Sequence, residues 1–330
     1  MYKSVVEGKG GISAKVVCDS IANGIRITTL ELRYPRFILA ELNTHRVFSR
    51  SSASSRAIPV AKMIEQVEND PAMPIHWGKN QAGMQAKEQW SYPVTNPYSQ
   101  RPNPREFAWK EAGEIASKYA FGFSQAGYHK QIVNRLLEPF QFMKTVVTST
   151  EWDNFFKLRD HPAAQPEIQE LACCMKKAME KSDAVELEYG GLHLPYVTEA
   201  EFNELESEKG NMIACSRLIK ASVARCARVS YMKHDNSSPD IEDDIELYNT
   251  LVVRPYTMKN GMYLPEDDPI HASPAEHQAT PMKIVNVYNH TPELEAAFEQ
   301  DGVSHIDRNM NCWSGNFRGW VQHRKLLERD

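Results

Sequence analysis

The chain has 330 residues, of which 42% are hydrophobic and 25% charged, a composition typical of a folded protein with room for one large domain or two. Its formal net charge of −5 gives no support to binding of a nucleic-acid polymer, which usually shows as a basic domain. No apolar run is long enough to span a bilayer, and the N-terminal sequence lacks the apolar core of a signal peptide. Six cysteines occur without paired metal-binding spacing, so we expect reduced thiols in a cytoplasmic protein.

The N-terminal part of the chain predicts a β-hairpin followed by helices. Residues 14–34 contain two β-like segments separated by Asn23–Gly24, a pair typical of a tight turn. The apolar sequence PRFILAEL that follows is helix-like, and Pro35 suits a first helical turn. A second short helix is expected over Val60–Glu68.

The stretch from Asn43 to Arg56 reads NTHRVFSRSSASSR, and five of the seven residues from Ser49 to Ser55 are serines. Small hydroxyl donors beside guanidinium groups can bind an anion through many hydrogen bonds and fixed positive charge. We expect these serines to form an anion-binding loop that leaves the preceding helix. A plain solvated serine-rich loop is the alternative.

The rest of the chain reads as one long loop followed by helices. Residues 70–104 are rich in Pro, Gly, Asn and Gln and carry two tryptophans, so we expect a long ordered loop or lid, with a plain surface connection as the alternative. The helices expected downstream cover 105–124, 129–137, 165–181, 215–225 and 241–252. The segment 254–269 is loop-like, and the basic segment 315–329 is helix-like.

Polar side chains cluster at two places in the predicted helical region. A helix over 129–138 would place Gln131 with Arg135 on one face, and Asn134 with Glu138 on another. A solvated face is the alternative there. The second place is the aromatic segment 151–167, discussed next.

In the segment 151–167, bulky aromatic residues stand next to Asn154 and Arg159. Such aromatics can wall a planar heterocycle while the polar groups hydrogen-bond its edge. Core aromatics with an incidental arginine are the alternative.

The segment from His271 to Gln278 carries metal-ligand residue types, but not the His-Glu-x-x-His spacing that places two imidazoles on one helical face. We therefore expect no metal site. The chain also contains no Gly-x-Ser-x-Gly elbow, no Walker loop and no Gly-x-Gly-x-x-Gly fingerprint.

These groups together resemble the flavin-dependent thymidylate synthases, the ThyX family. The family signature is Arg-His-Arg, then a spaced Ser, then Ser-x-Arg, and it corresponds here to Thr44-His45-Arg46, Ser49 and Ser54-Ser55-Arg56. Two positions depart from the family, because Thr44 replaces its first arginine and Ser52 replaces an acidic residue that is usual in the loop.

Two later motifs also match this family. The sequence Arg135-Leu-Leu-Glu-Pro139 resembles its element of an arginine, apolar residues and a proline. The element Asn-x4-Arg-x5-Ala-Gln-x-Glu-Ile is the most specific match, and it is present as Asn154, Arg159 and Ala164-Gln165-Pro-Glu167-Ile168.

The order of the motifs differs from that of the family. The Ala-Arg-Val-Ser and His-x-Ser-Pro-x-Glu-His elements, which are N-terminal in the family, occur late here, at Ala227–Ser230 and His271–His277. Residues 316–324 resemble, a second time, the helix that leads into the Arg-His-Arg signature. We therefore expect a circularly rearranged member with one motif helix partly duplicated, while residues 70–104 and 182–212 have no counterpart.

The resemblance implies conversion of dUMP to dTMP, with methylenetetrahydrofolate as carbon donor, FAD as hydride carrier and NADPH as reductant. It implies no cysteine nucleophile, and Arg159 would be the catalytic group that stabilises negative charge on the uracil ring. The residues implied for dUMP are Ser54, Ser55, Arg56, Arg135 and Arg159. Those implied for FAD are His45, Arg46, Asn154, Ser230, His271 and Ser273. Whether His45–Arg46 or His323–Arg324 contacts the flavin stays open.

The resemblance also implies an α/β (α+β) fold, with a mixed or antiparallel sheet flanked by helices. We expect a ThyX-like region over 1–210 and a flavin-binding region over 211–330 that packs into the same unit. His271 and His277 would contact the flavin or backbone groups rather than a metal ion. The family forms homotetramers with shared sites, so we expect a homo-oligomer, a tetramer or a dimer, with no nucleic-acid or membrane partner.

Three alternatives are open at this point. A related flavoenzyme with another outcome, such as hydroxymethylation of a pyrimidine nucleotide, is compatible with the altered Thr44 and Ser52. A non-catalytic nucleotide-binding protein would keep the phosphate loop without flavin. A metal-dependent hydrolase would use His271 and His277.

Overall fold

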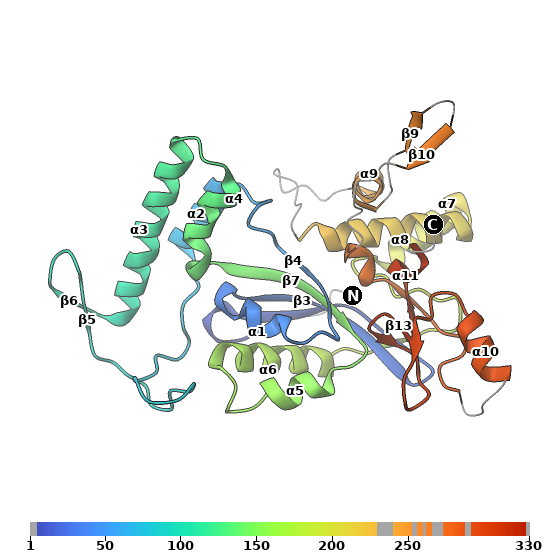
Figure 1. Cartoon of the computed structure of the whole chain (residues 1–330), viewed down its shortest axis with the longest axis horizontal. Coiled ribbons are helices and arrows are strands. Elements are labelled where there is room, and N and C mark those ends of the chain that lie inside the picture. The colour runs from blue at the N-terminus through green and yellow to red at the C-terminus, as the bar shows by residue number, and fades with distance from the viewer. Residues whose placement is uncertain are drawn as a thin grey trace.

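The computed structural model describes residues 5–229, 240–252, 256–259, 262–265, 273–287 and 292–327. Its centre is a mixed sheet that is antiparallel except for one strand pair. The strands follow the order β1 (Val6–Glu7), β2 (Ser13–Ala22), β3 (Ile25–Pro35), β7 (Phe142–Ser149) and β4 (Ser49–Ser52), and β8 (Val185–Glu186) pairs in parallel with β2. Helices flank this sheet, so the expected α+β architecture is confirmed (Figure 1).

The first hairpin forms where the sequence predicts it. Its turn is left-handed at both positions, with φ of 52° at Asn23 and 72° at Gly24, a conformation that asparagine and glycine adopt at low cost. Ala22 therefore pairs with Ile25, and the register continues along β2 and β3 with one irregularity after Val16. β3 pairs in turn with β7, which lies between β3 and the edge strand β4.

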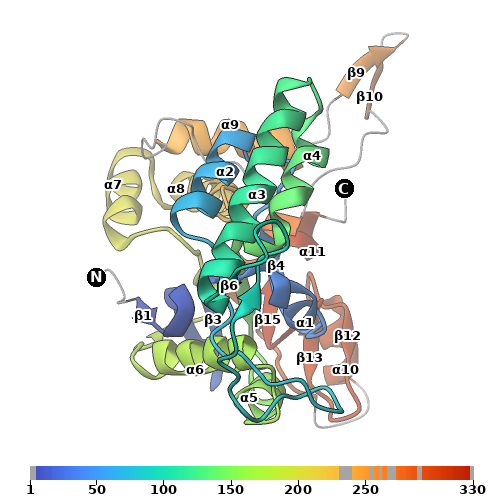
Figure 2. The same ribbon diagram turned by 90° about the vertical axis from the view of Figure 1, so that its left-hand side faces the viewer.

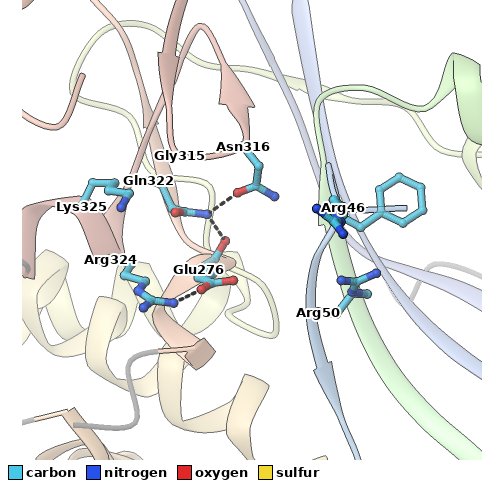
Figure 3. A pocket seen from close by; sticks show the side chains of 9 residues that line it. Arg46, Arg50, Glu276, Gly315, Asn316, Gln322, Arg324 and Lys325 are labelled. Carbon is cyan, nitrogen blue, oxygen red and sulfur yellow. Dashed lines mark hydrogen bonds and ion pairs between the residues drawn. The ribbon is translucent and has the colours of Figure 1, made fainter. Parts of the chain in front are cut away.

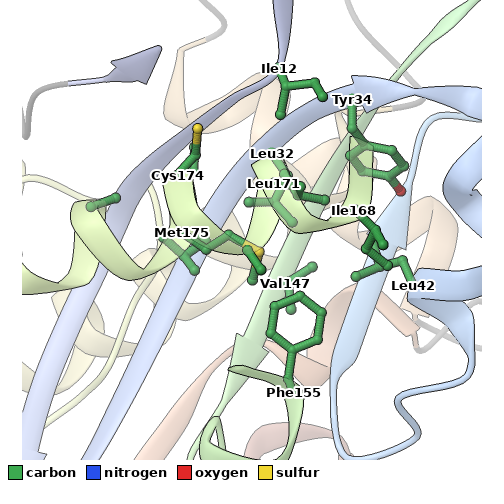
Figure 4. Close-up of a cluster of buried hydrophobic side chains, with 14 of the residues drawn as sticks. Ile12, Leu32, Tyr34, Leu42, Val147, Phe155, Ile168, Leu171, Cys174 and Met175 are labelled. Atoms are coloured by element: carbon green, nitrogen blue, oxygen red, sulfur yellow. The ribbon is translucent and has the colours of Figure 1, made fainter. Parts of the chain in front are cut away.

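One face of the sheet carries the main hydrophobic core (Figure 4). It packs against α1 (Leu39–Asn43), α5 (Asp153–Arg159) and α6 (Pro166–Glu180), and α5 and α6 lie below the sheet in Figure 1. Val147 belongs to this core, whereas its neighbour Val146 packs on the opposite face against Cys226 of α8 (Asn211–Ala227). One face of β7 thus packs against the core that includes α5 and α6, and its other face packs against α8.

A separate group of helices stands at one end of the sheet (Figures 1 and 2). It consists of α2 (Val60–Asn69), α3 (Arg105–Gln125), α4 (Lys130–Val133) and the 3-10 helix η3 (Asn134–Phe140). Met63, Val67, Val133, Leu137 and other apolar residues form its core.

The sequence predicts a single α-helix over 129–137, but this segment is divided into the short helix α4 and the 3-10 helix η3, so that prediction is wrong. Pro139 lacks an N–H and clashes with the preceding turn, so the chain continues as a 3-10 helix.

Residues 70–104 form a long connection that is anchored at several points, as expected for an ordered loop. The edge of the Trp77 ring packs against Trp109 of α3, with ring centroids 5.9 Å apart. The backbone N–H of Ile75 donates to the Glu167 carboxylate at 2.8 Å. Within the loop, β5 (Val94–Thr95) pairs with β6 (Pro102–Asn103).

The C-terminal part combines helices with short strands at the other end of the sheet. Its helical elements are α7 (Glu199–Lys209), α8, α9 (Ile241–Val252), η4 (Ser273–Glu276), α10 (Pro292–Glu299) and α11 (His323–Leu327). Its strands are β9 (Tyr256–Lys259), β10 (Met262–Pro265), β11 (Ala279–Pro281), β12 (His305–Ile306), β13 (Cys312–Ser314), β14 (Phe317–Arg318) and β15 (Trp320–Gln322). The hairpin β9–β10 corrects the loop expected over 254–269. None of the helices in these described ranges has the length and apolarity needed to cross a bilayer.

The helix predicted over 315–329 is mostly wrong, since β14 and β15 occupy most of residues 317–322 and, of the described residues in this range, only those of α11 are helical. Gly315 and Gly319 have φ of 59° and 70°, which a right-handed helix cannot contain. Trp320 is fully buried against the first hairpin, where its indole N–H donates to a backbone carbonyl. Burial of this large ring, rather than helical propensity, decides the local structure. The domain boundary at residue 210 stays a prediction.

Candidate functional site

The Arg-His-Arg-like segment and the aromatic segment meet between α1 and α5. Arg159, the last residue of α5, donates from Nε to His45 Nε2 at 3.0 Å and from Nη2 to Thr44 Oγ1 at 3.2 Å. The His45 ring is buried and contacts Phe155 edge-on, with centroids 4.9 Å apart. We call Thr44, His45 and Arg159 the His45 cluster.

The geometry of the His45 cluster fixes the protonation of its histidine. A guanidinium can only donate, so His45 Nε2 accepts and the ring proton lies on Nδ1. Burial lowers the pKa of His45, and the charges of Arg159 and Arg50 lower it further. The imidazole is therefore neutral at neutral pH and holds the guanidinium of Arg159 in one orientation.

The serine run is not the continuous loop that the sequence predicts, because Ser49 to Ser52 form β4 on the edge of β7. Ser49 Oγ is bonded to the side chains of Asn316 and Gln322, and Ser52 Oγ lies 3.0 Å from the hydroxyl of Thr145. The backbone groups of this segment are hydrogen-bonded to β7, and the hydroxyls of Ser49 and Ser52 are hydrogen-bonded to neighbouring side chains. Only the part after β4 is a loop.

That remaining loop carries the residues implied for the dUMP phosphate. The Asn134 side chain donates to the carbonyls of Ser55, at 2.7 Å, and of Ile58, at 3.0 Å, and thereby fixes the turn onto η3. Arg56 is exposed on this turn, and the side chain of Arg135, next to Asn134, is 57% exposed. These bonds bring the backbone of the turn to η3, and we call Ser54, Ser55, Arg56 and Arg135 the Arg56 cluster.

The two clusters lie at opposite ends of β4. The His45 cluster precedes the strand and the Arg56 cluster follows it. A four-residue strand spans roughly 13 Å. The two clusters are therefore set apart along this strand, and the hydrogen bonds of Arg159 go to Thr44 and His45 rather than to the Arg56 cluster.

A cavity of about 370 Å³ opens beside the His45 cluster (Figure 3). We call it the cationic pocket, and its lining residues are Arg46, Phe48, Arg50, Glu276, Gly315, Asn316, Gln322, Arg324 and Lys325. Arg46 and Arg50 form one wall, and the C-terminal residues form the other. The sequence analysis missed Arg50, Asn316, Gln322 and Lys325 as site residues. The repeated His-Arg motif at 323–324 was the one signal that pointed to this segment.

The remaining residues implied for FAD are partly placed. Asn154 is exposed in the first turn of α5, and Ser273 is exposed at the start of η4, whose last residue, Glu276, lines the cationic pocket. Ser230 and His271 lie outside the residues that the structure describes.

The ring nitrogens of His277 bond to side-chain hydroxyls rather than to the expected backbone groups, and a contact with flavin stays a prediction. Its ring is fully buried, with Nε2 2.9 Å from Ser51 Oγ and Nδ1 2.9 Å from Thr148 Oγ1. Burial lowers its pKa to about 3, so it is neutral and ties β4 to β7. Among the described residues no three His, Cys, Asp or Glu side chains could hold a metal ion together, and the absence of a metal stays a prediction.

All six cysteines are free thiols. Burial raises the pKa of Cys174 to about 11 and raises that of Cys226 even further. A thiol must ionise to act as a nucleophile, so these two are poor candidates for catalysis.

The family comparison agrees with this site. A family model described as "Thy1: Thymidylate synthase complementing protein" matches residues 20–183, a segment that contains both clusters. No curated protein sequence matches the chain. The fold, the clusters and this match define a protein of thymidylate synthesis. Through residues 20–183 the chain belongs to the Thy1 family, which is the ThyX family of thymidylate synthases. The match ends before the late motifs, so the circular rearrangement stays a prediction.

Proposed function

We propose that the protein converts dUMP to dTMP in a flavin-dependent reaction, with methylenetetrahydrofolate as carbon donor and NADPH as reductant. The observation that carries this proposal is the contact between Arg159 and His45, which joins the most specific motif to the Arg-His-Arg-like segment within the matched residues.

Arg159 is suited to stabilise a uracil ring that gains negative charge. Its bonds to His45 and Thr44 use Nε and Nη2, and a guanidinium has five N–H groups. The rest can donate to a uracil carbonyl and stabilise charge as it develops there. Because His45 is neutral, its hydrogen bond orients this guanidinium without neutralising the positive charge.

The residues around the His45 cluster fit a flavin nucleotide. Arg46 is exposed at the cationic pocket, where it can contact phosphate, and exposed Asn154 stands on the same helix as Arg159. A bound FAD would supply hydride transfer, which no side chain can perform. The chain itself would bind the phosphates and orient the rings.

The Arg56 cluster is suited to hold the phosphate of dUMP. Arg56 and Arg135 are both exposed on neighbouring segments, and Ser54 and Ser55 add hydroxyl groups. Guanidinium groups and hydroxyls are the donors that bind phosphate well. Glu138 bonds to Arg135 and also to Arg36, which limits the movement of the Arg135 side chain.

The separation of the two clusters favours a site shared between copies of the chain. Large apolar side chains are exposed on α3 and on the segment that follows it: Phe107, Tyr119, Phe121, Phe123, Tyr128, Ile132 and Leu136. Exposed apolar side chains in this number favour a protein interface. We propose a homo-oligomer, a tetramer or a dimer, in which the Arg56 cluster of one copy faces the His45 cluster of another.

The test is turnover of dUMP by the purified protein with each cofactor omitted in turn. We expect dTMP only when FAD, NADPH and methylenetetrahydrofolate are all present. A hydroxymethylated nucleotide would instead support the related flavoenzyme, and binding of dUMP without flavin or product would support a non-catalytic nucleotide-binding protein.

A further inference from the structure

The cationic pocket joins a wall from the family segment to a wall from outside it. Arg46 and Arg50 belong to the matched segment, whereas Arg324 and Lys325 are residues of α11, far beyond its end. Figure 3 shows these two walls facing each other across the cavity. The family match therefore explains only half of the pocket.

The lining of this pocket is strongly positive. Four cationic side chains line it, and Glu276, which pairs with Arg324, is the single carboxylate among its described lining residues. Arg50 is held by the backbone carbonyls of Leu42 and His45, each 3.1 Å from Nη1. A described lining with more cationic than anionic side chains favours an anionic ligand with more than one charge.

The two walls are also fixed relative to each other. The amide of Gln322, which is 2% exposed, donates to Ser49 Oγ at 3.1 Å and to the Glu276 carbonyl at 3.1 Å. Asn316 donates to the carbonyl of Val47 at 2.9 Å. The pocket is therefore pre-organised, so binding a ligand would order few side chains.

Gly315 contributes to this close packing. Its φ is 59°, and a Cβ at this position would lie 2.8 Å from Gln322 Oε1. Glycine adopts this conformation at low cost and leaves room for the amide that connects the walls. The close packing of Gly315 against Gln322 thus supports the hydrogen bonds that hold the C-terminal wall in place.

We propose that the cationic pocket binds the phosphate groups of a nucleotide that carries at least two of them, with Arg324 and Lys325 as ligand-binding residues that the family segment does not supply. The proposal rests on the proposed function only in the choice of nucleotides to test. A volume of about 370 Å³ accommodates the phosphates and part of a nucleoside. The pyrophosphate of FAD and the phosphates of NADPH share this chemistry.

The test compares two matched double variants by calorimetric titration with FAD, NADP+, ADP, inorganic pyrophosphate and dUMP. Arg324→Gln/Lys325→Gln removes two charges from the pocket. Lys283→Gln/Arg308→Gln removes two charges from exposed residues of the same region that do not line it. We expect the first pair to weaken binding of pyrophosphate and of FAD or NADP+ by roughly 10- to 100-fold, with dUMP unchanged. The control pair should bind all of them as the parent does.

A loss confined to FAD would identify the flavin as the occupant, and a loss confined to NADP+ would identify the reductant. Equal binding of every phosphate ligand by both double variants would overturn the proposal. Because Arg324→Gln leaves Glu276 unpaired, the single variant Lys325→Gln and thermal unfolding of each variant separate lost binding from lost folding. Failure of the parent to form dTMP, with pyrophosphate binding still dependent on Arg324 and Lys325, would overturn the proposed function alone.

Discussion

Arg159 and Arg56 are both arginines of the matched segment, yet their surroundings give them different tasks. Arg159 is oriented by His45 and Thr44, whereas Arg56 is exposed on a turn that Asn134 fixes. An oriented guanidinium suits charge that develops during a reaction. An exposed one suits a phosphate that is charged throughout.

We therefore expect Arg159→Ala to lower kcat by roughly 100-fold or more, and Arg159→Lys to recover only part of it, because an ammonium lacks the planar fork. Arg56→Ala should raise KM for dUMP by roughly 10- to 100-fold with a smaller effect on kcat. Steady-state kinetics and dUMP titration measure both constants, and both variants should still bind FAD. A KM effect of Arg159→Ala alone, with a kcat effect of Arg56→Ala alone, would reverse the two assignments.

His277 makes stability depend on pH. Burial lowers its folded-state pKa from 6.5 to about 3, so below about pH 6.5 the unfolded chain binds one more proton and stability falls with falling pH. Between about pH 6.5 and about pH 5 this amounts to roughly 2 kcal/mol.

The variant His277→Gln keeps a donor and an acceptor but does not titrate. We expect its free energy of unfolding, from urea titrations, to depend less on pH over this range than that of the parent. His323, whose pKa burial lowers to about 4, contributes in the same direction to both proteins. If the free energies of unfolding of parent and variant changed equally with pH, His277 would not be the source of the pH dependence.

Among the elements, β4 and the turn after it set the positions of the His45 cluster and the Arg56 cluster. Asn134 supplies two hydrogen bonds to the backbone of this turn, and its side chain is fully buried. We expect Asn134→Ala to cost roughly 1–3 kcal/mol of stability, since two carbonyls lose their donor. It should also weaken dUMP binding without changing FAD binding. The control is Asn103→Ala, an amide in the loop away from this turn; an equal loss of dUMP binding there would argue against a specific role for Asn134.

The sequence predicts elements well where local chemistry decides them. The Asn23–Gly24 turn and the helix that begins at Pro166 follow from such local features. The resemblance correctly indicated the family, while the contact between Arg159 and His45 needed three-dimensional packing to be seen.

The errors occur where distant segments decide the structure. Pairing with β7 turns half of the serine loop into a strand, and burial of Trp320 against the first hairpin overrides a helix-like pattern. His277 carries no sequence signal for its partners, because Ser51 and Thr148 are brought to it by β4 and β7. The cationic pocket is likewise assembled from residues of both ends of the chain.

At the scale of the whole molecule, the exposed apolar residues of α3 and the separated clusters predict a shared site. Replacing Tyr119 and Phe121 together by Glu should shift the native mass toward the monomer and abolish turnover, because charged side chains are not tolerated in an apolar interface. Light scattering after size-exclusion chromatography measures the mass, and Lys118→Glu on the same helix is the control. An unchanged oligomer in the double variant would place the interface elsewhere.

Sharing also predicts complementation between inactive chains. In a mixture of Arg56→Ala and Arg159→Ala chains, about a quarter of randomly assembled sites would contain both intact arginines. Turnover that stays at the level of the separate variants would contradict a site shared between copies.

The central claim is the flavin-dependent formation of dTMP, and the mass of the product formed from dUMP tests it most directly. The purified protein, incubated with dUMP, methylenetetrahydrofolate and NADPH, should yield dTMP when FAD is present and none when FAD is removed. A product with another mass, or dTMP formed equally well without flavin, would contradict the account.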